Sequence, residues 1–253
     1  MDTAQLLSTL DTHLSTSLTL IAGSRTARFD GGFLVASGVP VPDFNIAAIT
    51  DTSRSAPTAA AIAADLLAHD TEAIVIAPST GIAGAREGFT GTDLTEAGTA
   101  PLMVVEAGVG DDGPGDPDVR ELDRADGPVW GATIADTFTF STDVCDVLGA
   151  AIMGQTSDRI YGLWDDELRS TVWCTGTGPV RGIWGMATPP AHQRKGYGAR
   201  VLAEAIRRET RAGGNSFFLI ATEQGEPLYR RLGFETLDDV GIWVRGDSPE
   251  FAT

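Results

Sequence analysis

The residues whose types and spacing could do chemistry form a short run, Gln-Arg-Lys-Gly-Tyr-Gly, at positions 193–198. The run follows a strand-like segment at 182–188 and leads directly into an amphipathic helix expected at 199–211. Glycines at its fourth and sixth positions let the backbone approach a ligand closely and turn its amide N–H groups inward. The helix N-terminus behind them adds unpaired N–H donors and the positive end of the helix dipole. The sequence therefore predicts a pyrophosphate-binding loop.

The charge distribution also indicates an anionic ligand at this place. The chain has 35 acidic and 18 basic residues, a net charge of −17, which makes nucleic acid and anionic membranes poor general partners. Between Arg181 and Arg231 the balance inverts, with nine basic residues against four acidic ones. Lys195, inside the run, is the only lysine of the protein. Three arginines of the helix could equally form a solvated face, and their role stays open: Arg207, Arg208 and Arg211.

Length and composition set the remaining bounds. A chain of 253 residues is long enough for one large domain or two of ordinary size. We expect no signal peptide and no membrane span, because the sequence has neither the basic and apolar pattern of the first nor an apolar run long enough for the second. The cysteines and histidines show no metal-binding or disulfide spacing: Cys145, Cys174, His13, His69 and His192. These features favour a cytoplasmic protein without a metal.

A stretch rich in Gly, Pro and Asp at 107–117 is the clearest candidate linker. It predicts two domains, at residues 1–113 and 114–253. Hydrophobic periodicity before the linker predicts the following elements: helices at 3–20 and 57–69, and strands at 33–37, 44–50, 72–77 and 101–107.

The second part of the chain has a longer series of expected elements. It begins with a short strand at 118–124 and two helices, at 128–138 and 142–153. A three-strand meander follows, and after the glycine loop come a helix, a central strand, a short helix and a terminal hairpin. Their ranges are 160–164, 170–175 and 180–188 for the meander, then 199–211, 216–222, 226–232, and 234–236 with 241–245.

This order of elements over residues 118–246 resembles that of the GNAT N-acetyltransferase superfamily. The glycine run resembles the family's Gln/Arg-x-x-Gly-x-Gly/Ala signature, and Leu228 to Phe234 matches its Leu-Tyr-x-x-Leu-Gly-Phe motif at the expected distance. A Walker-type loop is disfavoured because no Gly-Lys-Ser/Thr follows, and a dinucleotide-binding pattern is missing. The expected fold class is α/β (α+β), with a mixed central sheet of GNAT type in two tandem GNAT-like domains.

The resemblance implies transfer of acetyl from acetyl-CoA to an amine. The strand residues Met186 to Thr188 would run along the pantetheine arm, with the Met186 N–H facing the thioester oxygen as that oxygen gains negative charge. Tyr229 would be the general acid that protonates the leaving thiolate, since a tyrosine of pKa about 10 stays protonated at neutral pH. The coenzyme contacts implied are Met186, Ala187, Thr188, Gln193, Arg194, Lys195, Gly196, Tyr197, Gly198, Ala199 and Thr222.

No general base is assigned, because the strand at 180–188 has no carboxylate where family members often have a glutamate. Four acidic loop residues could reach the substrate, although acidic turn residues are more often only solvated: Asp165, Asp166, Glu167 and Glu223. His192 is expected to cap or pack, and the amine proton could leave through water. The missing carboxylate leaves a second hypothesis open, a non-catalytic acyl-CoA-binding sensor, whereas Tyr229 favours the enzyme.

The first half has neither motif, yet its strand, helix and strand at 44–50, 57–69 and 72–77 echo the unit around the glycine loop. It is interpreted as a degenerate GNAT-like domain, with an unrelated α/β scaffold as the alternative. The acceptor is expected to be a small-molecule or peptide amine, with a homodimer as one candidate assembly. The acidic surface and four tryptophans favour a cationic or aromatic-bearing acceptor: Trp130, Trp164, Trp173 and Trp184.

Overall fold

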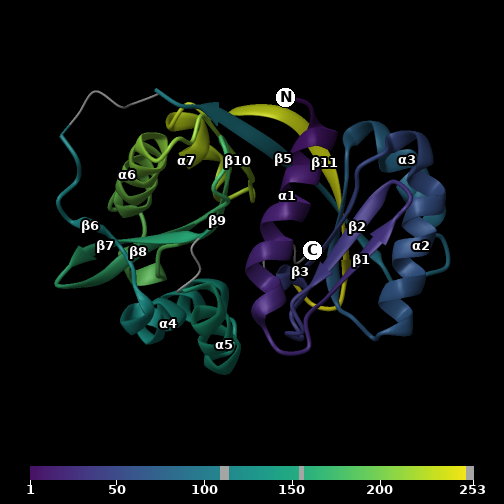
Figure 1. Cartoon of the computed structure of the whole chain (residues 1–253), viewed down its shortest axis with the longest axis horizontal. Helices are drawn as coiled ribbons and strands as arrows, with labels where there is room; N and C mark the ends of the chain where they lie inside the picture. The colour runs from purple at the N-terminus through teal and green to yellow at the C-terminus, as the bar shows by residue number, and fades with distance from the viewer. Residues whose placement is uncertain (109–113, 154–156, 249–253) are drawn as a thin grey trace. The chain divides into compact units, whose positions relative to one another are not determined.

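The structure is a computed structural model, and it describes residues 1–108, 114–153 and 157–248. Contacts divide it into two compact units, and each is described by itself (Figure 1). The first unit comprises Met1–Met103, Ile220–Glu223 and Thr236–Thr253, and the second comprises Val104–Leu219 and Gln224–Glu235. Residues 109–113, which hold part of the predicted linker and the predicted domain boundary, lie outside the described residues.

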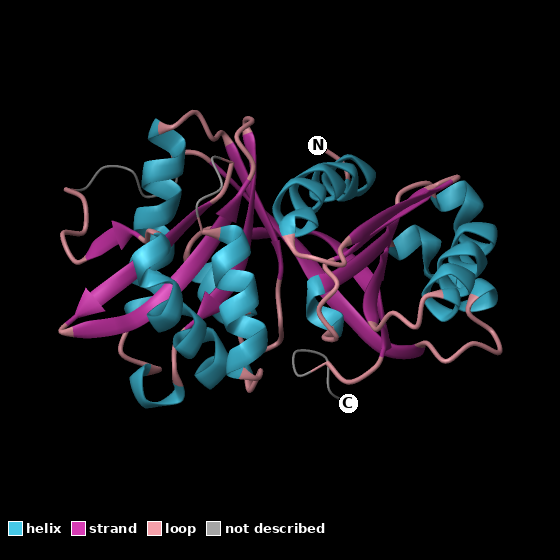
Figure 2. Ribbon diagram, turned by 60° about the horizontal axis from the view of Figure 1, so that its bottom comes forward, coloured by secondary structure: helices cyan, strands magenta, loops and turns pink. Residues whose placement is uncertain are grey.

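The first unit is built on a mixed sheet in which α1 (Thr3–Ser17) lies on one face and α2 (Ser55–Ala68) and α3 (Ile82–Gly88) on the other (Figures 1 and 2). Its strands follow the order β1-β2-β3-β4-β11-β5, and β3 and β4 pair in parallel whereas β4 and β11 pair antiparallel. The strands are β1 (Arg25–Phe29), β2 (Gly32–Ala36), β3 (Asn45–Ile49), β4 (Ala73–Ala77), β5 (Thr95–Glu106) and β11 (Glu235–Arg245).

Both faces of the central strands of this sheet are buried, which explains their continuous apolar sequence. β2 and β4 are buried at every position. Under α2, alternate strand residues such as Leu34 and Val75 pack with Ile62 and with Trp243 of β11. The C-terminal strand is therefore part of the hydrophobic core of the first unit.

The second unit contains the elements expected after the linker, apart from those at the C-terminal end of the chain. Its strands follow the order β10-β9-β8-β7-β6, with β9 and β10 parallel and the other neighbours antiparallel. In Figure 1, α6 lies above these strands, and α4 and α5 lie below them. The elements are β6 (Val119–Glu121), α4 (Gly127–Phe138), α5 (Thr142–Ile152), β7 (Arg159–Asp165), β8 (Glu167–Thr175), β9 (Val180–Ala187), α6 (Tyr197–Arg211), β10 (Ser216–Ile220) and α7 (Glu226–Arg231).

The predicted terminal hairpin is wrong, because residues 235–245 form one continuous strand, β11. Gly241 marks a close approach inside this strand: a side chain there would lie 2.7 Å from the Trp243 ring. β1 was not predicted, since its Arg-Thr-Ala-Arg-Phe sequence contains no apolar run and its exposure alternates along the strand. β5 begins at Thr95, earlier than expected, because its first residues are polar and exposed or half-buried.

Candidate functional site

The pairing of β9 changes at the point where chemistry was expected. β9 pairs in parallel with β10 only from Val180 to Gly182, although β9 continues to Ala187. On its other side the register with β8 shifts between Trp184 and Ala187, and Gly185 has a positive φ of 53°. This is a β-bulge, which bends a strand and turns its backbone groups out of the ladder. Met186 therefore lies at a bulge and beyond the registered β10 ladder.

The loop after β9 is held in shape by bonds between its own groups. The Gln193 side-chain amide donates to the Thr188 carbonyl at 3.0 Å, and the Lys195 ammonium donates to the Ala191 carbonyl at 3.0 Å. Arg194 and Gly196 both have left-handed backbone conformations, with φ of 62° and 85°. Two of the side chains expected to contact a coenzyme, Gln193 and Lys195, thus also define the shape of the loop.

The loop ends at the exposed N-terminus of α6. Gly196 is the N-cap and makes no side-chain capping bond, and the first amide bonded within the helix is that of Arg200, 3.1 Å from the Gly196 carbonyl. The amides of the first helical turn, Tyr197 to Ala199, therefore have no intrahelical acceptor. A side chain at Gly196 would have no protein atom within 4 Å, so the space in front of the loop is open to a ligand.

Gly198 brings several of the expected site residues together. A Cβ at this position would lie 3.5 Å from Met186 Cε, from Thr188 Oγ1 and from Leu228 Cδ2. Gly198 of α6 thus lies within van der Waals reach of the end of β9 and the start of α7. Tyr229, the next residue of α7, is 9% exposed and packs edge-on against Phe234, with ring centroids 5.8 Å apart. Thr222 belongs to the segment that is grouped with the first unit.

Most arginines of the basic span have carboxylate partners in the fold. Arg200 binds Asp116 at 2.8 Å and Asp118 at 2.6 Å, and its hydrogen bond lowers the pKa of Asp116. Other pairs join Arg181 to Glu209, Arg207 and Arg208 to Glu204, and Arg230 to Glu226.

The local positive charge suggested by the sequence is therefore largely neutralised. Neither a solvated face nor anion binding describes Arg207, which is buried in an ion pair. Within the part of the chain that the structure describes, Arg194 and Lys195 are the basic residues of the glycine loop, and they have no carboxylate partner.

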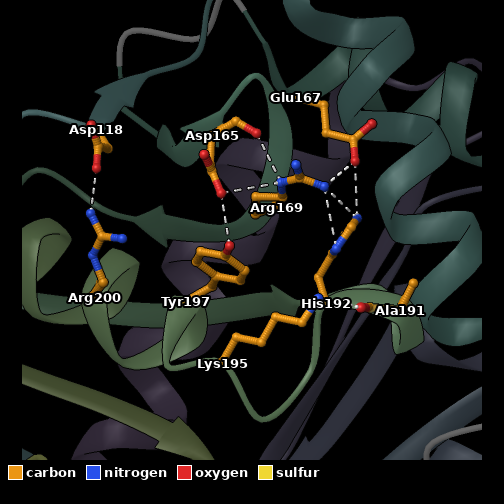
Figure 3. Close-up of polar contacts among 9 residues, drawn as sticks. All are labelled: Asp118, Asp165, Glu167, Arg169, Ala191, His192, Lys195, Tyr197 and Arg200. Carbon is orange, nitrogen blue, oxygen red and sulfur yellow. Dashed lines mark hydrogen bonds and ion pairs between the residues drawn. The ribbon is translucent and has the colours of Figure 1, made fainter.

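A group of polar side chains, here called the turn cluster, joins the β7–β8 turn to the glycine loop: Asp165, Glu167, Arg169, His192 and Tyr197 (Figure 3). The Tyr197 hydroxyl donates to Asp165 Oδ2 at 2.8 Å, a bond that raises the pKa of Tyr197. Arg169 forms an ion pair with Glu167 and donates from Nε to the Asp165 carbonyl at 2.9 Å.

The His192 ring lies between opposite charges in this cluster. Its Nε2 is 3.1 Å from Arg169 Nη1 and 3.3 Å from Glu167 Oε1. One ring nitrogen cannot accept from the arginine and donate to the carboxylate at once, so Nε2 can bond to only one of these two partners. Asp165 and Glu167, two of the acidic residues considered as general bases, are thus already engaged with donors.

Ile134 of α4 lies near the bulge of β9, and an aromatic pair that the sequence did not single out follows it in the chain. A Cβ at Gly185 would be 3.9 Å from Ile134 Cδ1 of α4, and Phe138 follows one turn later on that helix. Phe138 stacks on Phe140 at 5.7 Å, and both are half-buried. A signal for them exists in the Phe-Thr-Phe sequence at 138–140, but nothing in it indicates contact with another element.

The tryptophans expected near an acceptor have structural contacts. Trp173 donates to Asp158 at 3.0 Å, Trp184 donates to the Thr175 hydroxyl at 2.9 Å, and Trp130 is buried. Arg120 lies over the Trp164 ring at 4.5 Å. Their part in acceptor binding stays a prediction.

The two cysteines do not have the environment of reactive thiols. Cys145 and Cys174 are buried, and burial raises the pKa of Cys145 to about 11, so neither resembles an activated thiolate. Across the described ranges, no group of three or more His, Cys, Asp or Glu residues is placed to hold a metal ion. No helix within those ranges is long and apolar enough to cross a membrane.

Comparison with known proteins identifies a domain in the second part of the chain. Residues 151–236 match the family described as the acetyltransferase (GNAT) domain. The chain therefore contains a GNAT domain, in which the β9 bulge, the glycine loop and the start of α7 all lie.

Solved structures extend the likeness to nearly the whole chain. A GCN5-related N-acetyltransferase from Kribbella flavida aligns with a TM-score of 0.72 and 17% identity, covering 98% of this chain and 97% of that one. A GNAT-family protein from Novosphingobium aromaticivorans gives a TM-score of 0.59 at 18% identity, with 94% and 99% covered. A tandem GNAT protein from the clavulanic acid biosynthesis pathway gives 0.58 at 14% identity, with 97% and 94% covered. At these identities the likeness establishes the GNAT fold, and it confirms the fold class expected from the sequence.

Proposed function

We propose that this protein is an acetyl-CoA-dependent N-acetyltransferase that acts on a small-molecule or peptide amine. The observation that carries the proposal is the junction of β9 and α6 inside the GNAT domain. There the bulged strand β9 pairs with β10 only as far as Gly182. The glycine loop that follows ends at the first helical turn of α6, whose amides have no intrahelical acceptor. An acyl-CoA needs both features, a strand edge for the pantetheine amides and N–H donors for the pyrophosphate.

The proposed chemistry follows from this arrangement. The amine nitrogen attacks the thioester carbonyl, the carbonyl oxygen becomes an oxyanion near the Met186 N–H, and the C–S bond then breaks. Tyr229 gives its proton to the departing thiolate and regains one from solvent. The amine loses its proton to water, because Asp165 and Glu167 are engaged by Tyr197 and Arg169. The products are an N-acetylated acceptor and free coenzyme A.

The second candidate is an acyl-CoA sensor without turnover. Two observations favour it. β9 carries no carboxylate, and Tyr229 is almost fully buried against Phe234. A sensor would retain the coenzyme site and show no acceptor-dependent thiol release.

The proposal is tested by measuring free thiol release from acetyl-CoA with a panel of amines, amino acids, aminoglycosides and peptide N-termini. We expect release that depends on at least one acceptor and on protein concentration. Tight acetyl-CoA binding without release across the panel would favour the sensor, and absence of binding would exclude both functions.

We further expect one acetyl-CoA per chain, bound by the second unit. At the corresponding strand-to-helix connection of the first unit, between β3 and α2, the chain has Asp51 instead of a glycine loop. The Ser53 hydroxyl and N–H donate to its carboxylate, and these bonds lower the pKa of Asp51. A carboxylate that stays charged disfavours a phosphate at this connection. Titration calorimetry should give a stoichiometry near one, and two equivalent sites per chain would contradict this interpretation.

Deletion of residues 1–113 should give an insoluble or poorly active fragment. β11 pairs with β4 from Gly241 to Arg245, and Trp243 is 2% exposed in the core of the first unit. The fragment would keep β11 but lose β4 and α2, so Trp243 and its neighbours would face water. Solubility and thiol release of the fragment provide the measurement, and a fully active soluble fragment would show that the first half is dispensable.

A further inference from the structure

The glycine loop contains a non-glycine residue in a left-handed backbone conformation. Arg194 and Gly196 are both left-handed within three positions, with φ of 62° and 85°. Glycine adopts this conformation freely, whereas for a residue such as Arg194 it is unfavourable. Strained segments persist where surrounding contacts fix them.

The turn cluster supplies such contacts from the β7–β8 turn. Tyr197 is the first residue of α6, directly after Gly196, and its hydroxyl donates to Asp165 Oδ2 at 2.8 Å. Asp165 is itself held, because Arg169 donates to its carbonyl at 2.9 Å. In Figure 3 the Tyr197 ring points from α6 toward the turn and meets Asp165. The bond therefore ties the first helical turn, which carries the unpaired amides, to the sheet.

The negative charge of Asp165 also disfavours binding of an anion nearby. A carboxylate near a phosphate site repels the ligand, and the repulsion decreases with distance and with salt. As a hydrogen-bond acceptor for Tyr197, Asp165 supports the loop, whereas through its charge it opposes a bound phosphate. These two effects have opposite signs and can be separated by substitution.

We propose that Tyr197 and Asp165 are positioning residues for the coenzyme: their bond holds the glycine loop and the α6 N-terminus in the conformation that receives the pyrophosphate. The inference rests on the proposed function. It assigns to the Tyr197 side chain a role that is distinct from direct contact with the coenzyme.

Three variants test this assignment through the calorimetric Kd for acetyl-CoA. Tyr197→Phe removes the hydroxyl and Asp165→Ala removes the acceptor, and each should weaken binding about fivefold to tenfold, as loss of one exposed hydrogen bond of ordinary strength does. Asp165→Asn retains an oxygen acceptor and removes the charge, so it should bind as tightly as the wild type or up to about threefold more tightly. Glu96→Gln, which removes an exposed carboxylate paired with Arg86 in the first unit, is the matched control and should leave Kd unchanged.

Two further readouts separate positioning from a general loss of structure. In the protein without coenzyme, Tyr197→Phe should speed amide hydrogen exchange at 194–199 with an unchanged melting temperature. With a confirmed acceptor, the loss should appear in KM for acetyl-CoA and not in kcat.

The inference is overturned if Tyr197→Phe binds acetyl-CoA like the wild type, or if Asp165→Asn is as weak as Asp165→Ala. A wild-type protein that does not bind acetyl-CoA would instead remove the proposed function and the positioning role with it. The amide-exchange experiment then still shows whether the bond holds the loop.

Discussion

Replacement of Gly196 by valine is expected to abolish acetyl-CoA binding, with Kd at least about 100-fold weaker, or about 3 kcal/mol. Gly196 has φ of 85°, and a Cβ there would meet no protein atom within 4 Å. The folded protein has room for a side chain at this position, but the side chain would occupy the space that the pyrophosphate needs. A β-branched residue also disfavours the left-handed conformation that turns the loop amides toward this space.

Gly213 offers a matched control at the other end of α6. It has φ of 94°, and a side chain there would also have no protein atom within 4 Å. Gly213→Val therefore introduces a similar backbone strain away from the loop, and calorimetry should show nearly wild-type affinity for acetyl-CoA. Equal losses in both variants, or wild-type affinity in a folded Gly196→Val protein, would contradict the assignment of the loop.

Replacement of Tyr229 by phenylalanine should lower turnover about 100-fold or more with little change in acetyl-CoA affinity, as loss of a positioned general acid does. The ring stays in place, because its edge contact with Phe234 at 5.8 Å does not involve the hydroxyl. The measurement is kcat with a confirmed acceptor, together with the calorimetric Kd.

Tyr161→Phe serves as the control for loss of a tyrosine hydroxyl. The Tyr161 hydroxyl donates to Glu209 at 2.7 Å in the interior, and burial together with this carboxylate raises the pKa of Tyr161. Its removal should lower the melting temperature and leave kcat of the folded protein unchanged. Turnover of Tyr229→Phe within twofold of the wild type would remove the general-acid role from Tyr229 and favour the sensor.

The fold of the second unit could be predicted from sequence because its signals are local. The meander, the glycine loop and the Leu-Tyr-x-x-Leu-Gly-Phe motif are each formed by neighbouring residues, and the structure has their elements in the expected order. The terminal hairpin was predicted wrongly, because residues 237–240 continue the strand instead of forming a turn. In the fold Gly241 lies within the continuous strand β11, where a side chain would meet the Trp243 ring.

Those contacts of the site that join residues far apart in the chain could not be predicted from the sequence. The basic span suggested free positive charge, but Asp116 and Asp118, which precede it by many residues, neutralise Arg200. The bond between Asp165 and Tyr197 joins a turn and a helix that are separated in the chain by two strands. No local sequence motif therefore predicts it. The positions of the glycines, in contrast, could be inferred directly because backbone conformation constrains residue type.

Amide hydrogen exchange with and without saturating acetyl-CoA tests the central claim most directly, because it locates the coenzyme on the chain. We expect slower exchange at 186–188 and 194–199, where the bulged strand and the glycine loop would hold the coenzyme. Exchange at 50–56, the corresponding connection of the first unit with Asp51, should be unchanged. Protection at 50–56 in place of 194–199, or no protection at either segment, would contradict the claim that this protein binds acetyl-CoA through its second unit.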